Sequence, residues 1–435
     1  MTVTLIKTKA EQTLIGEFAA KAKSLPGDAR GRADAMRAFE RDGLPHRRVE
    51  AWKYTDLRNV LKEAHPIAVG GDATTVTAAA VDLALGELAH IAADRVVFVN
   101  GGYRAQLSTL PKGVVVTSMA GFQPGKPLVA APSDETVIAL NQALASDGVA
   151  VSITTGQTLA RPLMVVMVAA GPHGQFVSVR HRVDVGAGAS AQVIEAKVTL
   201  KGAASGQLNA VTEVAVGDGA QLQHIQVGLE GETATSLAST LVSLEQSSTY
   251  RLFQLTVGTG LARNQAFVRF AGEGAKLDIS GLMLGRKRQH CDTTLVIDHA
   301  VPNCESRELF KTVLDNEARA VFQGKVIVRP DAQKTDGKQM ANALMLSEGA
   351  EFDSKPELEI YADDVVCGHG ATVAELDHDL MFYLRSRGIP QPEARAMLID
   401  SFAGEALDKV ADENVHDALS AIARAWLVAT TSHAV

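Results

Sequence analysis

The sequence of 435 residues predicts a mainly β fold, a solenoid of short strands placed between helical segments at the two ends. Three observations support this prediction. Apolar residues recur at helical spacing near both termini, and they alternate with polar residues through the middle of the chain. A glycine-containing turn also repeats before several of the alternating segments. Few helix-length patterns interrupt the middle, which disfavours a parallel sheet with crossover helices.

Residues 1–65 are expected to form an N-terminal helical region, because apolar side chains recur there every three or four positions. Leu14 and Phe18 lie on one face of a first helix, and a second helix is expected around Phe39. The next segment, residues 49–58 (VEAWKYTDLR), is dense in aromatic and charged side chains. It could dock a partner or fill the space between the helices and the β core, and the second interpretation is the simpler.

Residues 95–372 are expected to form the β core. Apolar and polar residues alternate there in several runs, for example through Val177, Val179 and Val183. A period of two is typical of strands that bury one face and expose the other.

A glycine-containing turn precedes several of these strands. Its copies end at Ala189, Ala220, Ala275, Ala318 and Ala350, which are 31, 55, 43 and 32 residues apart. A unit of about 30 residues fits two of these intervals, and the interval of 55 could hold two shorter units. Turn–strand units at this spacing, without helices between them, favour a β-solenoid whose coils pair backbone to backbone. A β-sandwich, with turns about every 8–12 residues, is the competing interpretation.

The last part of the chain, residues 373–435, returns to helical spacing. Asp377 can cap a helix that carries Leu380 and Tyr383, and two further helices are expected after it. Their apolar stripes could pack on the solenoid or against another protein. Periodicity alone favours packing within the chain.

Composition excludes several classes of protein. The formal net charge is −8, which disfavours binding to nucleic acid or to an anionic membrane surface by bulk charge. No stretch approaches about 18 consecutive apolar residues and residues 1–10 are polar, so neither a membrane span nor a signal peptide is supported. Three cysteines are too few for a disulfide framework, and a reducing, cytoplasmic location is expected.

Nucleotide-binding motifs are not supported either. Residues 121–127 (GFQPGKP) superficially resemble a phosphate-binding loop, but the glycine spacing is one residue short. Pro127 also stands where a Ser or Thr would hold Mg²⁺, and no dinucleotide-type glycine fingerprint follows a strand. The chain is therefore expected neither to hydrolyse ATP nor to bind a dinucleotide.

The densest group of reactive side chains lies at residues 363–370 (DDVVCGHG). Cys367 and His369 are two apart, so on an extended strand they point to the same face and could share one metal ion. Sulfur together with imidazole suits iron, zinc or copper. Two ligands cannot close a tetrahedral site, so a partner chain or sulfide would have to complete it. The simpler alternative is a buried thiol beside a hydrogen-bonded histidine in a glycine-rich turn.

The other two cysteines are weaker candidates. His290 and Cys291 are adjacent, so on a strand their side chains point to opposite faces and a joint metal site is not expected. Cys304 is most simply a structural thiol.

Two long runs near the C-terminus, residues 355–372 (KPELEIYADDVVCGHGAT) and 380–389 (LMFYLRSRGI), closely resemble the SufB/SufD family of iron–sulfur cluster assembly scaffolds. Within that family the chain is more similar to the SufD branch than to SufB, because no cysteine precedes Cys291. Three shorter segments add to the resemblance, at residues 50–55 (EAWKYT), 304–307 (CESR) and 322–325 (FQGK).

The resemblance implies a right-handed parallel β-helix between helical ends. It also implies a non-enzymatic scaffold subunit that pairs with SufB and binds the ABC-type ATPase SufC through the C-terminal helices. The partner would then supply the ATP site that this chain lacks. The expected SufC-binding residues are apolar positions of those helices, namely Leu380, Tyr383, Ile399 and Phe402.

The resemblance also assigns a role to the Cys367 and His369 pair. His369 matches a histidine that, in SufD proteins, lies at the SufB–SufD interface and is thought to help hold the nascent cluster with a SufB cysteine. Cys367 matches a family cysteine whose role is either structural or secondary. Iron and sulfide would be bound in the complex and not stably by the chain alone. Flavin binding by the complex and homodimerisation of the isolated chain are left open.

Two other functions remain open from the sequence. One is a purely structural partner of SufB that has no metal ligands of its own. The remote one is a cytoplasmic carbohydrate-acting β-helix enzyme that uses Asp298, Arg329 and Asp331. Scarce aromatic residues and the absence of a secretion signal argue against such an enzyme.

Overall fold

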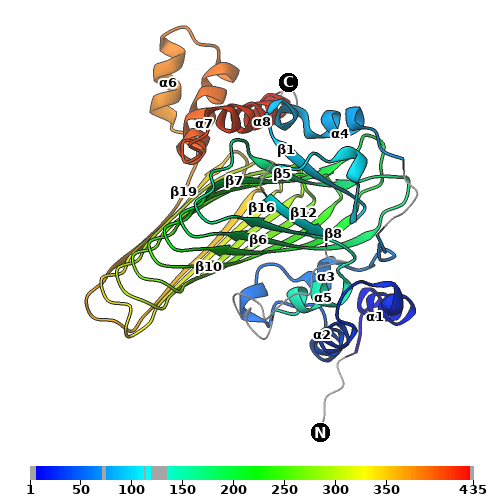
Figure 1. Cartoon of the computed structure of the whole chain (residues 1–435). Helices are drawn as coiled ribbons and strands as arrows, with labels where there is room; N and C mark the ends of the chain where they lie inside the picture. Colours follow the sequence, from blue (N-terminus) through cyan, green and yellow to red (C-terminus); the bar gives the residue numbers. More distant parts are fainter. Residues whose placement is uncertain (1–5, 71–74, 112–113, 119–134, 432–435) are drawn as a thin grey trace.

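The computed structural model of the chain describes residues 6–70, 75–111, 114–118 and 135–431. Two long β-sheets face each other and form a flattened solenoid, with helices on their outer sides (Figure 1). The loop-like run at residues 121–127 lies outside the described residues. No helix in the described part of the chain is both long and apolar enough to span a membrane.

From β4 onward, successive strands alternate between the two sheets, so each of these coils contributes one strand to each sheet. The first sheet contains β1 (Asp94–Val99), β2 (Gly102–Tyr103), β5 (Leu163–Ala169), β7 (Ser190–Thr199), β9 (Gln221–Leu229), β11 (Thr249–Val257), β13 (Lys276–Gly285), β15 (Glu305–Leu314), β17 (Asp336–Met345) and β19 (Val366–Ala374). The second contains β3 (Val114–Ser118), β4 (Val149–Ile153), β6 (Phe176–Val185), β8 (Gln207–Val216), β10 (Thr235–Leu244), β12 (Leu261–Phe270), β14 (His290–His299), β16 (Arg319–Val328) and β18 (Glu351–Ile360).

Pairing between coils is parallel and in register, for example along the whole of β10 and β12. Among the described strands, antiparallel pairs occur only at the N-terminal end, between β1 and β2 and between β3 and β4. Sandwich sheets are antiparallel, so this topology excludes the β-sandwich interpretation and confirms the solenoid.

The repeated turn has a clear structural role. Gly188, Gly219 and Gly274 have positive φ angles, and each is followed by an alanine that is at most 1% exposed at the corner of a coil. In copies that the glycine pattern misses, Ser248 and Cys304 occupy the alanine position and are fully buried. The interval of 55 residues between Ala220 and Ala275 therefore holds two coils, which meet at Ser248.

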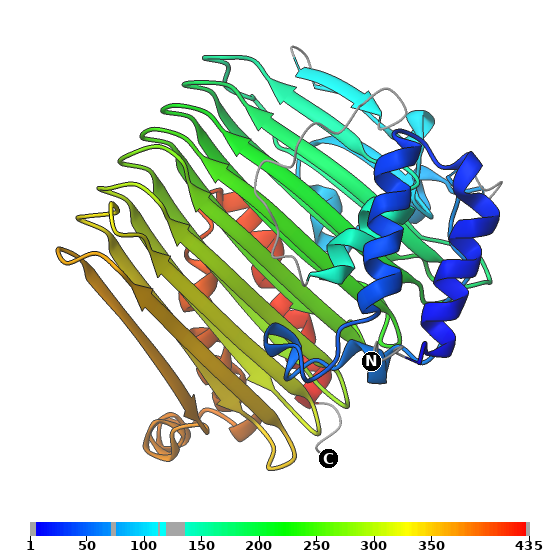
Figure 2. The ribbon, with the colours of Figure 1, turned by 90° about the horizontal axis from the view of Figure 1, so that it is seen from below.

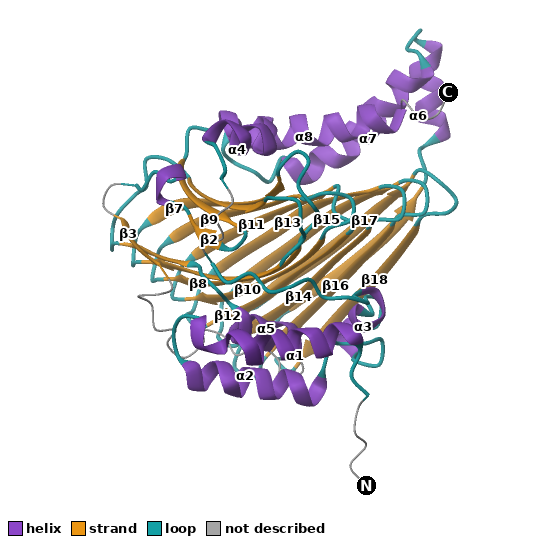
Figure 3. Ribbon diagram, turned by 90° about the vertical axis from the view of Figure 1, so that its right-hand side faces the viewer, coloured by secondary structure: helices purple, strands orange, loops and turns teal. Residues whose placement is uncertain are grey.

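The helices are α1 (Lys9–Lys21), α2 (Ala29–Asp42), α3 (Leu57–Val60), α4 (Ala78–Leu85), α5 (Thr136–Leu144), α6 (His378–Ser386), α7 (Gln391–Leu407) and α8 (Glu413–Thr431). Helices α1, α2 and α5 lie across the outer face of the second sheet (Figures 2 and 3). Leu14, Phe39 and Leu140 pack there with Leu237 and Leu261 of β10 and β12.

The C-terminal helices lie on the opposite side of the solenoid (Figure 3). Helices α7 and α8 cover the outer face of the first sheet, where Ile399 and Trp426 join Leu282 and Val313 in one apolar cluster. Asp377 caps α6 by accepting hydrogen bonds from the backbone N–H groups of Asp379 and Leu380. No residue of α6 is buried, and the helix projects beyond the solenoid.

The two ends of the solenoid differ. At the first end the sheets finish in the antiparallel pairs of β1 with β2 and of β3 with β4, whereas at the other end β18 and β19 close the two sheets. No residue of β18 or β19 is buried. The last coil therefore exposes both its strand edges and one end of the core.

Candidate functional site

Cys367 and His369 lie on β19, the last strand of the first sheet. They are in register with Gly337 and Gln339 of β17, whose side-chain positions face the interior of the solenoid. Cys367 is half-buried against the core, and His369 is exposed. The two side chains therefore share the inward face of the last coil, at its open end.

The environment of Cys367 keeps its thiol protonated. Burial raises the pKa of this thiol, and the carboxylates of Asp336 and Glu308 raise it further. A hydrogen bond with the Gly337 backbone lowers this pKa, but by less than burial and the two carboxylates together raise it. A metal ion that binds the sulfur must displace this proton, so binding here depends on pH.

The interior behind the pair is polar. Ser306 Oγ lies 3.1 Å from His299 Nε2. Gly337 lies between Ser306 and Cys367 in the same column of residues and carries no side chain to separate them. In the next column, Glu308 and Gln339 lead to His369. Sequence reasoning missed these groups, because they come from strands about 30 and 60 residues earlier in the chain.

The described residues contain no group of three or more His, Cys, Asp or Glu side chains that could hold a metal ion. Cys367 and His369 thus offer at most two protein ligands from this chain. A tetrahedral site would need further ligands from sulfide or from another chain.

The other two cysteines are buried. Cys304 is buried at a coil corner and its thiol lies 3.4 Å from the carbonyl oxygen of Pro302. Cys291 is buried inside the solenoid, where burial raises its pKa to about 12. Its neighbour His290 points the other way and lies 2.8 Å from Thr55 Oγ1. The predicted separation of His290 and Cys291 onto opposite faces is confirmed.

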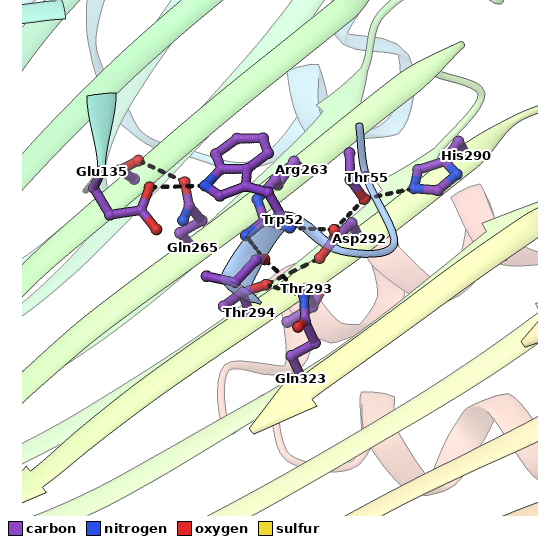
Figure 4. Close-up of polar contacts among 12 residues, drawn as sticks. Trp52, Thr55, Glu135, Arg263, Gln265, His290, Asp292, Thr293, Thr294 and Gln323 are labelled. Atoms are coloured by element: carbon purple, nitrogen blue, oxygen red, sulfur yellow. Dashed lines mark hydrogen bonds and ion pairs between the residues drawn. The ribbon is translucent and has the colours of Figure 1, made fainter. Parts of the chain in front are cut away.

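A second polar cluster lies where the segment at residues 50–55 contacts the outer face of the second sheet (Figure 4). Asp292 is fully buried and accepts hydrogen bonds from Arg263, Thr55 and Thr294. Arg263 is also fully buried and donates to the carbonyl oxygen of Ala51 at 2.7 Å.

Trp52 completes this cluster. Its ring stacks on the Arg263 guanidinium at 3.8 Å, and its indole N–H donates to Glu135 at 3.2 Å. Trp52 is itself fully buried, so the segment fills the space between the N-terminal helices and the sheet. The structure favours the plug over the docking patch. Sequence reasoning missed Arg263 and Asp292, because charged residues at outward positions of a strand are normally solvent-exposed and only the structure shows that residues 50–55 cover them.

The apolar residues expected to bind a partner fall into two groups. Leu380 and Tyr383 of α6 are about half exposed, and Phe382 beside them is 74% exposed. Ile399 is buried against the solenoid, and Phe402 packs there with the Lys311 ammonium 4.5 Å from its ring. Ile399 and Phe402 therefore contact the chain's own first sheet, as helical periodicity favours, and are not presented to a partner.

Two of the residues considered for carbohydrate chemistry contact each other. Asp298 accepts a hydrogen bond of 2.8 Å from Arg329 on the surface. No ion pair is described for Asp331.

Comparison with known proteins agrees with this architecture. Residues 17–165 match the family model described as the SufBD protein N-terminal region. Residues 167–402 match the SUF system FeS cluster assembly, SufBD core domain. The chain belongs to the SufB/SufD family of iron–sulfur cluster assembly proteins.

Curated relatives span most of the chain. The iron–sulfur cluster assembly protein SufD of Escherichia coli is 35% identical over 379 residues, which cover 86% of this chain and 87% of the relative. A SufBD family protein of Synechocystis is 32% identical over 400 residues, which cover 87% of this chain and 86% of the relative. These matches support the resemblance drawn from the C-terminal motif, and they identify the chain as SufD-like.

Proposed function

We propose that this chain is a non-ATPase scaffold subunit that pairs with a SufB protein through its open coil and helps to hold a nascent iron–sulfur cluster there. The observation that carries the proposal is the position of Cys367 and His369 on the last, uncovered strand. A metal-capable pair that has two ligands and faces an unpaired edge is suited to a site completed by a second chain.

The surface around this edge supports an interface. Among the described strands, β18 pairs only with β16, and β19 pairs only with β17. Such edges can accept a strand from another chain. Large apolar side chains are also exposed close to them, which favours a protein partner over solvent: Ile360, Tyr361, Val366 and Val373.

Helix α6 is the proposed contact for the SufC-type ATPase. Its exposed Leu380, Phe382 and Tyr383 give an apolar surface, on which the Arg387 guanidinium lies 5.1 Å from the Tyr383 ring. The helix follows β19 after three residues, so a force on α6 is transmitted directly to the strand that carries His369. Nucleotide-dependent movement of the ATPase would then shift the SufB-facing edge and expose the site to iron and sulfide.

The test is to co-express the chain with its candidate SufB and SufC partners and purify the complex without oxygen. Native mass spectrometry gives the stoichiometry, and chemical assay gives bound iron and sulfide. We expect one copy of this chain in the complex and a large loss of iron on His369→Ala. His173→Ala, which removes an exposed histidine from a distant loop, is the matched control.

The outcomes separate the candidate functions. A complex that assembles but keeps its iron in the Cys367→Ser/His369→Ala double variant would leave this chain as a structural partner of SufB only. A chain that binds neither partner would overturn the scaffold proposal. Phe382→Ala should weaken SufC capture while SufB pairing persists, because α6 and the strand edge are separate surfaces.

A further inference from the structure

Two buried polar side chains lie directly inward from His369. Gln339 of β17 is in register with His369, and Glu308 of β15 is in register with Gln339. Neighbouring strands are about 4.8 Å apart, so the three residues form one column that runs from the open edge into the interior. The next residue inward from Glu308 in this column is Ile279, which is apolar.

Neither inner residue makes a side-chain hydrogen bond of ordinary geometry, although the Ser306 hydroxyl interacts with the Glu308 carboxyl. Glu308 and Gln339 are each 3% exposed. Both carboxyl oxygens of Glu308 and both amide atoms of Gln339 are buried without a hydrogen bond. Unpaired buried polar groups destabilise a fold, and apolar side chains would fill this space at lower cost. Folding alone therefore does not explain why the chain carries them.

The surroundings leave room for the amide. A side chain at Gly324, on the facing sheet, would come within 2.1 Å of Gln339 Oε1. The Gln339 amide therefore extends across the interior toward the facing sheet. Gly324 leaves this space free because it has no side chain. The next column of inward-facing residues, on the side away from Cys367, is apolar and contains Phe310 and Ala341. The nearest polar group that Gln339 can reach along the column, other than Glu308, is the His369 ring.

We propose that Gln339 and Glu308 are positioning residues that orient the His369 ring: one ring N–H donates to Gln339 Oε1, and Gln339 Nε2–H donates to the Glu308 carboxyl. A metal-binding histidine commonly donates its other N–H to such a group, which sets the tautomer and the direction of the ligating nitrogen. His369, Gln339 and Glu308 make none of these hydrogen bonds in their present rotamers, so the proposed chain of bonds requires new rotamers of all three side chains.

The state of Glu308 is compatible with this role. Burial raises the pKa of Glu308 to about 8. The Ser306 hydroxyl and the Arg307 charge lower this pKa by less than burial raises it, so the carboxyl is neutral at pH 7. A neutral carboxyl still accepts a hydrogen bond through its carbonyl oxygen. Glutamine at position 308 would accept the same bond, whereas methionine, of similar size, would not.

The first experiment measures the tautomer of His369 in the isolated full-length chain by ¹⁵N NMR of labelled histidine, with His369→Ala to assign the signals. We expect one dominant neutral tautomer in the parent chain and in Gln339→Glu and Glu308→Gln. Gln339→Leu and Glu308→Met should give a mixture of the two tautomers. An unchanged tautomer ratio in Gln339→Leu would overturn the proposal.

Thermal unfolding separates positioning from structural damage. Gln339→Leu and Glu308→Met remove unpaired buried atoms, so their melting temperatures should stay the same or rise while His369 loses its orientation. A merely structural role predicts the reverse, with lower melting temperatures and an unchanged tautomer ratio.

The second experiment concerns the metal and rests on the proposed function. In the purified complex, Gln339→Leu should lose iron to a chelator about tenfold faster than Gln339→Glu, a typical effect of removing an outer partner of a histidine ligand. If His369→Ala leaves the iron in place, the proposed ligand role fails while the tautomer result still stands. If His369 is required but Gln339→Leu and Gln339→Glu release iron equally, the positioning role fails.

Discussion

Buried polar groups are paired in one region of the molecule and largely unpaired in another. The first region is the contact between residues 50–55 and the second sheet, and the second is the C-terminal end of the solenoid, from β15 to β19. In the first region, the buried Asp292 carboxylate is satisfied by Arg263, Thr55 and Thr294. In the second, Glu308 and Gln339 are also buried, but their side-chain polar atoms make no hydrogen bond of ordinary geometry, and of the described hydrogen-bond donors only the Ser306 hydroxyl interacts with the Glu308 carboxyl. The first arrangement completes the fold within the chain. The second leaves polar groups available at the end where another chain is expected to bind.

The largest expected effect would break the first region. Asp292→Ala leaves the Arg263 cation buried and without its carboxylate, so the free energy of unfolding should fall by about 3–5 kcal/mol. Asp298→Ala is the control, because Asp298 lies on the same face of β14 and pairs with the half-exposed Arg329. It should cost about 1 kcal/mol or less. Urea unfolding measures the free energy of unfolding of both variants. Equal losses in the two variants would contradict the contrast between the two regions.

A smaller effect tests the unpaired acid in the second region. The folded-state pKa of Glu308 is raised to about 8 from 4.5, so its neutral burial favours folding fully below pH 4.5, and this contribution is lost as the pH rises through 8. Between pH 4.5 and 7 the parent chain should lose about 3 kcal/mol relative to Glu308→Gln. Urea unfolding at the two pH values measures the difference. Parallel pH profiles for the two chains would mean that Glu308 has a partner.

The smallest effect concerns Glu195, a buried acid in the middle of the solenoid that does have partners. Its Oε1 lies 3.3 Å from His224 Nε2 and 2.7 Å from Thr212 Oγ1. Burial alone raises its pKa, but the His224 charge and the hydrogen bonds outweigh burial and lower it to about 2. The stabilisation is therefore present above pH 4.5 and is lost as the pH falls toward 2.

Acid unfolding checks this prediction. Between pH 5 and 3 the parent chain should lose about 2 kcal/mol more than Glu195→Gln. The sign is opposite to that expected for Glu308, because one acid is paired and the other is not. If both acids gave the same sign, pairing would not be what distinguishes the two regions.

Much of the solenoid followed from local patterns. The period of two assigned the strands, and the glycine turns located the coil corners, where a positive φ and a small buried side chain are both required. The spacing of Cys367 and His369 was enough to place them on one face of a strand. These features depend on residues that are close in sequence, so the sequence alone reveals them.

Other features depended on which distant segments meet. Ile399 and Phe402 carry the same apolar signal as Leu380 and Tyr383, yet the first pair is covered by the first sheet and the second pair is not. The partners of Arg263 come from residues 51, 52 and 292, and no local pattern predicts that meeting.

The sequence by itself determined the class of fold, the family and the two residues at the candidate site. Only the tertiary structure decided that these two residues lie on an uncovered last strand with Gln339 and Glu308 behind them. The reason is physical: strand alternation is set by each residue's immediate neighbours, whereas parallel pairing of coils brings together residues about 30 positions apart. Burial, charge pairing and exposure follow from that pairing.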